Sequence, residues 1–304
     1  MKILKIWRYY PMKRLTALFA ALLLTLSVAG CGGSEASSSS AAAQSSSTEA
    51  SSSTAESSSE AAASQKLVVA ASPSPHAEIL ESVKDQLAAK GIELEIQEFT
   101  DYVLPNNAVD SGDVDANYFQ HQPYLTNFNE MNGTDLVSAG SIHFEPLGIY
   151  AGQVSSLEEL KDGDSIAVPN DTTNEARALN LLAAQGLITL KEGVGLEATP
   201  MDIVDNPKNL KFLELAAEQV PNAVTEVAVA VINGNYAIPA GLSDKIIVSE
   251  DPQSEAAQTF ANIVAIRPED AEDNRILALI EALTSEETRQ FITEKYSGAV
   301  VPVF

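Results

Sequence analysis

Short apolar runs alternate with amphipathic stretches over residues 66–304. Residues 66–72 form a short apolar run typical of a buried strand, and 92–99 alternate apolar and polar side chains as a half-buried strand does. Between them, apolar residues recur at helical spacing as far as Gly91, a residue type that commonly ends helices. The pattern therefore predicts a strand, a helix and a second strand at the start of the folded region.

The same alternation continues to the C-terminus. Further strands are predicted over residues 115–118, 136–152, 165–168, 210–215, 227–232 and 263–266. Further helices are predicted over residues 122–131, 173–184, 270–283 and 286–296. This alternation is typical of βαβ units, so we expect an α/β fold with largely parallel sheets. The length suffices for two lobes with a cleft between them; the expected lobes are residues 66–150 with 251–304, and residues 151–250.

The first 31 residues have the features of a secretory signal. Their bases are followed by an apolar run at 15–28, which is shorter than the ~20 residues of a transmembrane helix. The small residues Ala29 and Gly30 then precede Cys31, the one cysteine of the chain. This order resembles a bacterial lipobox, which implies cleavage before Cys31 and lipidation of its thiol. We therefore expect a chain that is anchored to a membrane by lipid, with translation starting at residue 1 or at residue 12.

Residues 32–65 consist almost entirely of Ser, Ala, Glu, Thr and Gln. With no large apolar side chain to bury, this segment is predicted to be a disordered tether. Removing the five bases of the signal leaves 13 of 18 bases against 42 acids, and so a net charge of -29. Such a surface argues against a nucleic-acid partner, which binds a basic face. It also repels anionic headgroups, so membrane attachment is expected through the lipid only.

One arginine lies where its charge is locally disfavoured. Thr172 and Glu175 have the spacing of a capping box, which predicts the start of a helix after the strand at 165–168. Arg177 then lies near the positive end of that helix. An anion bound by both the helix N-terminus and the guanidinium would explain this position. An ordinary pair with one of the many acids explains it equally well.

Aromatic residues gather at a second strand-to-helix junction. Phe119, His121 and Tyr124 lie within six residues of one another, and Tyr102 lies upstream. Ligands often bind at such junctions in α/β sheets, whereas aromatic side chains more often serve ordinary core packing. A further segment, 230–236, ends a β-branched strand in Asn and Gly, and a simple turn accounts for it as well as a ligand site does.

The histidines leave a metal-binding protein open as an alternative. His76, His121 and His143 lie near predicted strand ends, and imidazoles with a carboxylate can hold zinc or manganese. Against this, no two of them have close helical spacing and the sequence has no His-rich loop. It also has no nucleophile elbow, zinc-protease motif or phosphate loop. We therefore expect a protein that is not an enzyme and has no metal site or cofactor.

Several of these segments together resemble the methionine-binding lipoproteins of ABC importers. They occur in order along the chain at Ser74–Leu80, Glu98–Tyr102, Asp115–Tyr124, Pro169–Arg177, Asp205–Phe212, Ile232–Tyr236 and Gly298–Pro302. The resemblance implies a two-lobed, type II periplasmic-binding-protein fold with an amino acid in the inter-lobe cleft. The implied ligand is methionine, with the L-isomer expected; D-methionine, the sulfoxide and a methionine-containing dipeptide are alternatives.

The resemblance also implies roles for eight residues. Arg177 holds the α-carboxylate, and Asn174 lies nearby at the same helix start. Asn233 and Asn262 receive the α-amino group or fix the backbone end of the ligand. The thioether is walled by Tyr102, Phe119, His121 and Tyr124, since sulfur is attracted to aromatic rings. The implied partners are the permease and the ATPase of an ABC importer, at the extracytoplasmic face of the cell membrane.

Overall fold

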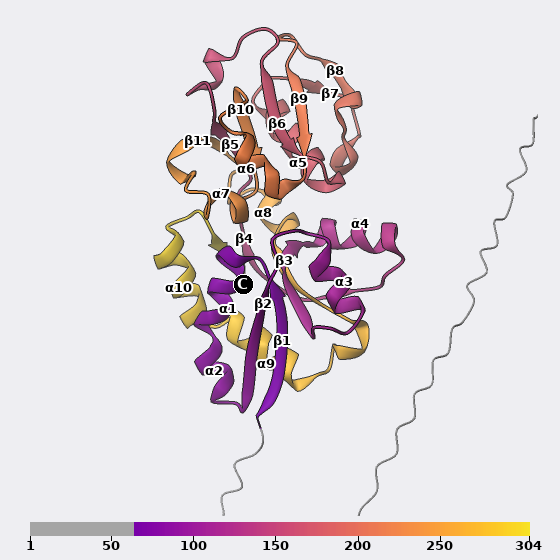
Figure 1. Cartoon of the computed structure of the whole chain (residues 1–304), viewed down its shortest axis with the longest axis vertical. Helices are drawn as coiled ribbons and strands as arrows, with labels where there is room; N and C mark the ends of the chain where they lie inside the picture. Colours follow the sequence, from indigo (N-terminus) through magenta and orange to yellow (C-terminus); the bar gives the residue numbers. More distant parts are fainter. Residues whose placement is uncertain (1–63) are drawn as a thin grey trace, which may run out of the picture. The chain divides into compact units, whose positions relative to one another are not determined.

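The computed structural model describes residues 64–304, except for the side chains of residues 255 and 256. The signal, Cys31 and nearly all of the expected tether lie outside these residues. Within them, none of the helices combines the length and the apolar character needed to cross a bilayer. Figure 1 shows the described residues arranged around two separate β-sheets.

The first sheet has six strands in the order β13-β4-β12-β3-β1-β2. Its strands are β1 (Gln65–Ala71), β2 (Ile92–Glu98), β3 (Ala116–His121), β4 (Val137–Phe144), β12 (Asn262–Ile266) and β13 (Val301–Pro302). The helices of this lobe are a π-helical turn (Pro73–Ala77), α1 (Glu78–Ser82), α2 (Lys84–Ala88), α3 (Leu104–Asp110), α4 (Gln122–Asn132), α9 (Asn274–Leu283) and α10 (Glu286–Tyr296). The core of the lobe includes the fully buried Leu67, Val69, Leu80, Leu87 and Leu279.

The second sheet has five strands in the order β11-β5-β10-β6-β9. Its strands are β5 (Gly148–Ala151), β6 (Ser165–Pro169), β9 (Lys211–Leu215), β10 (Val229–Ile232) and β11 (Ile246–Ser249). Its lobe also contains α5 (Thr172–Ala184), α6 (Val220–Ala223), α7 (Gly234–Ala237) and a small hairpin of β7 (Thr189–Leu190) and β8 (Ile203–Asp205). Single 3-10 turns of this lobe occur at Leu157–Glu159, Gly195–Glu197, Pro200–Asp202, Ala217–Gln219 and Ser243–Lys245. A further 3-10 turn, Pro268–Asp270, follows β12 in the first lobe.

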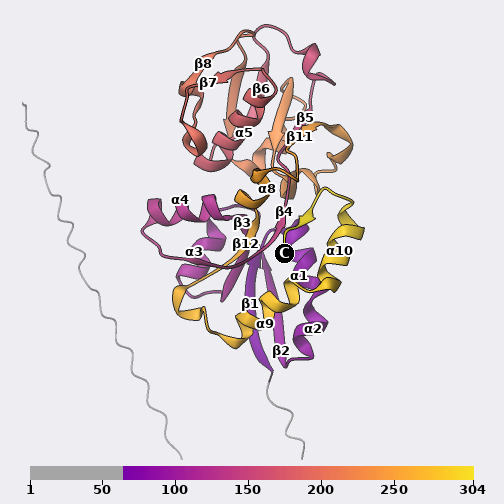
Figure 2. The same cartoon turned by 180° about the vertical axis from the view of Figure 1, so that it is seen from behind.

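Two segments connect the sheets. The first runs from β4 into β5, and the second leaves β11, forms α8 (Glu255–Thr259) and returns as β12 (Figure 2). Because β5 pairs in the second sheet from Gly148 onward, the first crossing ends three residues before the expected boundary at residue 150. The first strand likewise begins at Gln65, which we had expected in the tether. The division into lobes by residue number otherwise stays a prediction.

The expectation of largely parallel sheets was wrong. β1 pairs in parallel with β2 and β3, and β6 pairs in parallel with β9 and β10. The strands that connect the lobes, however, pair antiparallel with their neighbours: β12 with β3 and β4, and β5 with β10 and β11. A strand that crosses directly from the other sheet has no helical return on its own sheet, so it need not run parallel. Both sheets are therefore mixed.

Helix boundaries also differ from the periodicity. The first predicted helix is divided at Val83, whose φ of -103° and ψ of 0° separate α1 from α2. The helix predicted over 270–283 starts at Asn274, after a 3-10 turn and the capping residue Asp273. Periodicity reports which side chains are buried, and it is insensitive to a local break in backbone hydrogen bonding.

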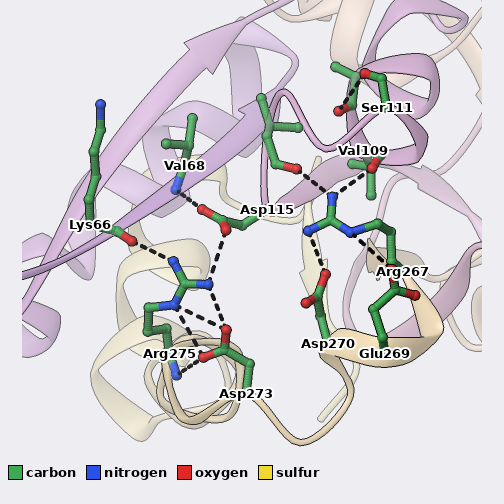
Figure 3. Close-up of polar contacts among 12 residues, drawn as sticks. Lys66, Val68, Val109, Ser111, Asp115, Arg267, Glu269, Asp270, Asp273 and Arg275 are labelled. Atoms are coloured by element: carbon green, nitrogen blue, oxygen red, sulfur yellow. Dashed lines mark hydrogen bonds and ion pairs between the residues drawn. The ribbon is translucent and has the colours of Figure 1, made fainter.

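Two arginines fasten the returning C-terminal segment to the first sheet (Figure 3). Arg275 donates to the Lys66 carbonyl at 2.6 Å and to Asp115 at 3.1 Å, while Asp115 accepts the Val68 amide N–H at 2.7 Å. Arg267 donates to the carbonyls of Val109 and Val114 and pairs with Asp270. These contacts hold the chain that follows β12 against the start of β1 and the segment between α3 and β3.

Candidate functional site

A pocket lies where elements of the two lobes meet. It encloses about 340 Å³ of space between atoms, part of it open to solvent. All eight residues of the expected site line it: Tyr102, Phe119, His121, Tyr124, Asn174, Arg177, Asn233 and Asn262. The lining also includes Gln120, Glu145, Gly234 and Asn235. The structure thus brings the expected residues together, and their roles toward a ligand remain predictions.

Most of the lining lies at the ends of strands, where the backbone turns toward the other lobe. His121 ends β3 and caps α4, since its Nδ1 accepts the Tyr124 backbone N–H at 3.2 Å. Helix α5 is capped by Asp171, which accepts from the backbone N–H of Asn174 at 3.0 Å. The N-cap is therefore Asp171, one residue before the Thr172 that the capping-box spacing predicted. A carboxylate competes well for this position because it accepts strongly near the positive helix end.

Aromatic rings form one wall of the pocket. The ring of Tyr102 lies 5.6 Å from those of Phe119 and Tyr124, and the latter two are 6.0 Å apart, between centroids. Tyr236 packs behind this wall, outside the pocket lining, with its centroid 5.1 Å from that of Tyr102. His121 faces another neighbour, since its ring meets Phe260 edge-on at 5.1 Å. Three of the four residues expected around the thioether therefore form a contiguous apolar surface, and the imidazole borders it.

Arg177 is almost completely buried, at 4% exposure. Its Nε donates to Glu250 at 2.8 Å, and its Nη2 donates to Glu250 and, at 3.0 Å, to the Glu145 carbonyl. The guanidinium also lies over the Phe260 ring, 4.2 Å from its centroid. No described residue accepts from Nη1. The anion that the helix position predicts is thus a side chain in this structure, and one nitrogen of the guanidinium is left for a ligand.

A chain of amides joins the two lobes across the pocket. Asn174 Oδ1 accepts from His121 Nε2 at 3.2 Å and from Asn233 Nδ2 at 2.9 Å. Burial, together with the nearby charge of Arg177, lowers the pKa of His121 to about 3, so the ring is neutral at pH 7. Because Nδ1 accepts from the Tyr124 N–H, the single ring proton is on Nε2 and points to Asn174.

The partners of the other amides decide what each offers a ligand. Asn262 Oδ1 accepts from His76 Nε2 at 2.9 Å, which leaves its amide N–H groups for the pocket. Asn233 offers an acceptor instead. Its Nδ2 donates to Asn174, and its buried Oδ1 has no partner. Asn235 accepts from the Tyr102 hydroxyl at 2.6 Å, and its buried Nδ2 has no partner. The pocket therefore presents unpaired donors and unpaired acceptors in separate places.

Glu145 is the main lining residue that the sequence analysis missed. It is 5% exposed, and its Oε2 has no hydrogen-bond partner. Burial raises the pKa of its carboxyl to about 7, while His76 and Arg177 oppose the rise. The one available signal was a lone acid in the extended segment Ile142–Leu147. Asn235 also lines the pocket, whereas the β3 residue Tyr118 does not.

The three histidines do not converge on one point. His76 and His143 lie together, with ring centroids 4.9 Å apart, and both contact Glu145. These three side chains are the one group among residues 64–304 whose positions could hold a metal ion. His121 instead bonds to Asn174 in the other lobe. The three histidines that the sequence suggested as one metal site therefore lie in two different places.

Comparison with known proteins identifies the family. The model of the NlpA lipoprotein family matches residues 67–304. The methionine-binding lipoprotein MetQ of Bacillus subtilis is 42% identical over 240 residues, which cover 78% of this chain and 87% of that protein.

Solved structures agree with this comparison. A lipoprotein from Ruminococcus gnavus is 52% identical with a TM-score of 0.78, covering 79% of this chain and all of that one. A nutrient binding protein from Burkholderia cenocepacia, solved bound to methionine, is 40% identical with a TM-score of 0.74, covering 78% of this chain and all of that one. The two-lobed binding-protein fold predicted from sequence is thus confirmed, and the chain belongs to the NlpA lipoprotein family.

Proposed function

We propose that this protein captures methionine outside the cell and delivers it to an ABC importer. The observation that carries the proposal is the distribution of unpaired polar atoms in the pocket beside an aromatic wall. An α-amino acid needs donors for its carboxylate, acceptors for its ammonium and a surface for its side chain. A pocket with all three, and with no activated nucleophile among its lining residues, suits a binding protein better than an enzyme.

The carboxylate would lie against Arg177 Nη1. Charge-assisted hydrogen bonds of this kind are roughly twice as strong as neutral ones, and burial strengthens them further. Asn262 would add a second donor, because His76 holds its carbonyl oxygen away from the ligand. Asn262 would thus serve the carboxylate, and of the two roles left open for it this is the one that fits the donor it offers.

The ammonium would lie near Asn233, whose Oδ1 is an acceptor without a donor. Asn174 would not contact the ligand through a free polar atom, because its oxygen serves His121 and Asn233 and its nitrogen serves Asp171. Its role would be to orient Asn233. Such an indirect role is still essential, because a rotated Asn233 amide would present a donor to a cation.

The thioether would lie along Tyr102, Phe119 and Tyr124. Contacts between sulfur and aromatic rings are worth ~0.3–1.5 kcal/mol each, which favours methionine over a side chain of similar length without sulfur. The same wall also admits the D-isomer, the sulfoxide and the end of a dipeptide, so these ligands are compared directly in the test below.

Delivery to an importer would depend on the N-terminal segment. We infer that Cys31 carries the lipid, that the tether links it to the folded residues, and that the protein faces the outside of the membrane, where a permease with its ATPase accepts the ligand. The lipobox and the membership of a lipoprotein family support this part of the proposal.

Native mass spectrometry of the full-length protein, purified in detergent, tests the ligand assignment. We expect a bound species heavier by the mass of methionine. Calorimetry on protein freed of ligand then ranks L-methionine, D-methionine, the sulfoxide and methionine dipeptides. Tight binding of zinc with none of these organic ligands would contradict the proposal and favour a metal-binding protein.

A further inference from the structure

Glu145 lies between the lobes, in the segment that connects β4 to β5. Its carboxylate is buried, and one oxygen, Oε2, has no partner. The backbone N–H of Asn235 lies near enough to lower the pKa of this carboxyl, but it makes no hydrogen bond to Oε2. An unpaired buried carboxylate oxygen is costly, so Oε2 favours a further donor. The other oxygen, Oε1, lies against two histidine side chains, which hold the carboxylate in place.

Two imidazoles hold Oε1. His143 Nε2 lies 2.9 Å from it and His76 Nε2 lies 3.4 Å from it. The Tyr118 hydroxyl bonds to His143 Nδ1; if it donates there, the ring proton of His143 is on Nε2 and points to Glu145. His76 Nε2 faces only acceptors, Oε1 and the Asn262 oxygen, so its proton is also on Nε2. Oε1 therefore accepts the N–H of His143. The N–H of His76, which donates to Asn262, lies beside the same oxygen.

The surroundings of Oε2 limit what can reach it. A Cβ on Gly234 would lie 2.6 Å from Oε2, so the backbone of α7 approaches the carboxylate closely and only glycine fits there. Both Glu145 and Asn233 line the pocket, and each has one buried acceptor without a donor. Two unpaired acceptors, one of them anionic, suit a cation with several N–H groups, as an alkylammonium has.

We propose that Glu145 is a specificity-determining residue that restricts the pocket to ligands with a free α-ammonium group, and that His76 and His143 position its carboxylate. This inference rests on the proposed function, since it assigns the α-ammonium group of the proposed ligand to Glu145. It implies rejection of des-amino and N-acylated analogues, because either would leave the carboxylate buried and unpaired.

The titratable groups around Glu145 keep one protonation state near pH 7, so the titration of Glu145 can be measured by itself. The titratable or charged groups that interact with it are His76, His143, Arg177, Tyr102, Tyr118, Tyr150 and Tyr296. Burial lowers the pKa of His76 to about 4 and that of His143 to about 3, and it raises the pKa of the four tyrosines. Between pH 5 and 8, Glu145 is thus the member of this group that titrates, and an ammonium beside it would favour its ionised form.

Calorimetry on ligand-free, full-length protein tests the selection directly. The wild type and Glu145→Gln are each titrated with methionine and with 4-(methylthio)butanoate, its des-amino analogue. We expect the wild type to prefer methionine by on the order of 100-fold or more, and Glu145→Gln to prefer it by less than about tenfold. An unchanged preference in the variant overturns the inference. If the wild type binds neither compound, it is the proposed function that fails.

Proton release on binding gives a second measurement, whose first step needs the wild type alone. Titrations of methionine at pH 7 in buffers of different ionisation enthalpy should show release of a fraction of a proton per ligand. Glu175→Gln is the matched control, because burial also raises the pKa of Glu175 to about 7 while that residue does not line the pocket. Release should persist in Glu175→Gln and vanish in Glu145→Gln. Equal release in both variants overturns the inference.

Substitution of His143 tests the positioning role. His143→Gln can still donate an N–H toward Glu145, whereas His143→Leu cannot. We expect the preference for methionine over its des-amino analogue to be partly kept in the first variant and largely lost in the second. Full retention in His143→Leu overturns the positioning role. A stabilisation of the wild type by zinc alone that His143→Leu abolishes also overturns it, since the cluster would then be a metal site.

Discussion

Arg177 and Glu250 form a two-point ion pair that links the pocket to a segment connecting the lobes. Nε and Nη2 of the guanidinium donate to the two carboxylate oxygens, and Glu250 Oε2 also accepts the backbone N–H of Leu147. Nη2 additionally reaches the carbonyl of Glu145. Arg177 therefore touches both of the chain segments that pass between the sheets, and a ligand carboxylate on this arginine would act on both.

Removing the guanidinium should abolish most ligand binding. Deleting one partner of a buried, charge-assisted pair costs several kcal/mol, so Arg177→Ala should weaken methionine binding by about two to four orders of magnitude. Calorimetry measures the loss. Arg267→Ala is the control: this arginine also holds backbone carbonyls, those of Val109 and Val114 (Figure 3), but it does not line the pocket. Wild-type affinity in Arg177→Ala would refute its role.

Neutralising the partner should have a different effect. In Glu250→Gln the charge of Arg177 loses its counterion, which should destabilise the ligand-free protein by roughly 3 kcal/mol in urea unfolding. A ligand carboxylate restores the missing charge, so methionine affinity should not fall and methionine should stabilise this variant more than the wild type. A loss of affinity beyond about tenfold would mean that Glu250 orients Arg177 rather than neutralising it.

Local sequence was sufficient to predict residues that lie at the ends of strands. Asn174 and Arg177 follow β6, and His121 ends β3, so alternation of strand and helix already placed each of them at the carboxyl end of a strand in its own sheet. Glu145 escaped prediction because residues 136–152 were predicted as one extended stretch, although Pro146 and Gly148 interrupt it just after Glu145. Its exposure to the pocket depends on β4 and β5 belonging to different sheets, which is a matter of long-range pairing.

The partner of Arg177 was unpredictable for the same reason. The helix position correctly indicated an anion, but Glu250 lies 73 residues away along the chain, among many other acids. Strand direction was likewise undetermined: β12 has the apolar run of a buried strand whether it runs parallel or antiparallel to β3. Hydrophobic pattern reports burial, and only the connection between the lobes decides direction.

Acid should destabilise the ligand-free protein through its histidines. Burial lowers the pKa of His76 to about 4 and those of His121 and His143 to about 3, from 6.5. Between those values the unfolded chain binds protons that the folded chain does not, so stability present above pH 6.5 is lost as the pH falls toward 3. Glu145 and Glu175, whose pKa values are raised to about 7 from 4.5, act in the opposite direction between pH 7 and 4.5.

Urea unfolding from pH 7 to 4 measures the balance of these groups. We expect a shallow change while the glutamates offset the histidines, and a steep fall below about pH 4.5, where the glutamates are protonated in both states. His121→Gln removes one of the three histidines and should make the fall shallower. An acid limb as steep as that of the wild type would show that His121 is charged in the folded protein.

Membrane attachment should depend on one thiol. Cys31→Ser removes the expected lipidation site, so the protein should appear in the medium or accumulate as unprocessed precursor. The chain expected after cleavage, with a net charge of -29, would repel an anionic membrane. Cell fractionation followed by immunoblotting measures this, and Ser34→Ala in the tether is the control. Attachment that survives Cys31→Ser would require a different anchor.

The aromatic wall should select the side chain without affecting the backbone clamp. Phe119→Ala removes a ring that packs between Tyr102 and Tyr124, so methionine should bind about tenfold to a hundredfold more weakly, as expected for a loss of 1–3 kcal/mol of side-chain contact. The amino acid alanine does not reach the wall, and its weak binding should be unchanged.

At a ligand concentration a thousand times the wild-type dissociation constant, binding stabilises the fold by about 4 kcal/mol and raises the melting temperature by several degrees. The shift should shrink in Phe119→Ala and persist in Phe291→Ala, whose ring packs against Tyr296 on α10. Equal weakening of both amino acids in Phe119→Ala would mean that the ring supports the clamp instead of reading the thioether.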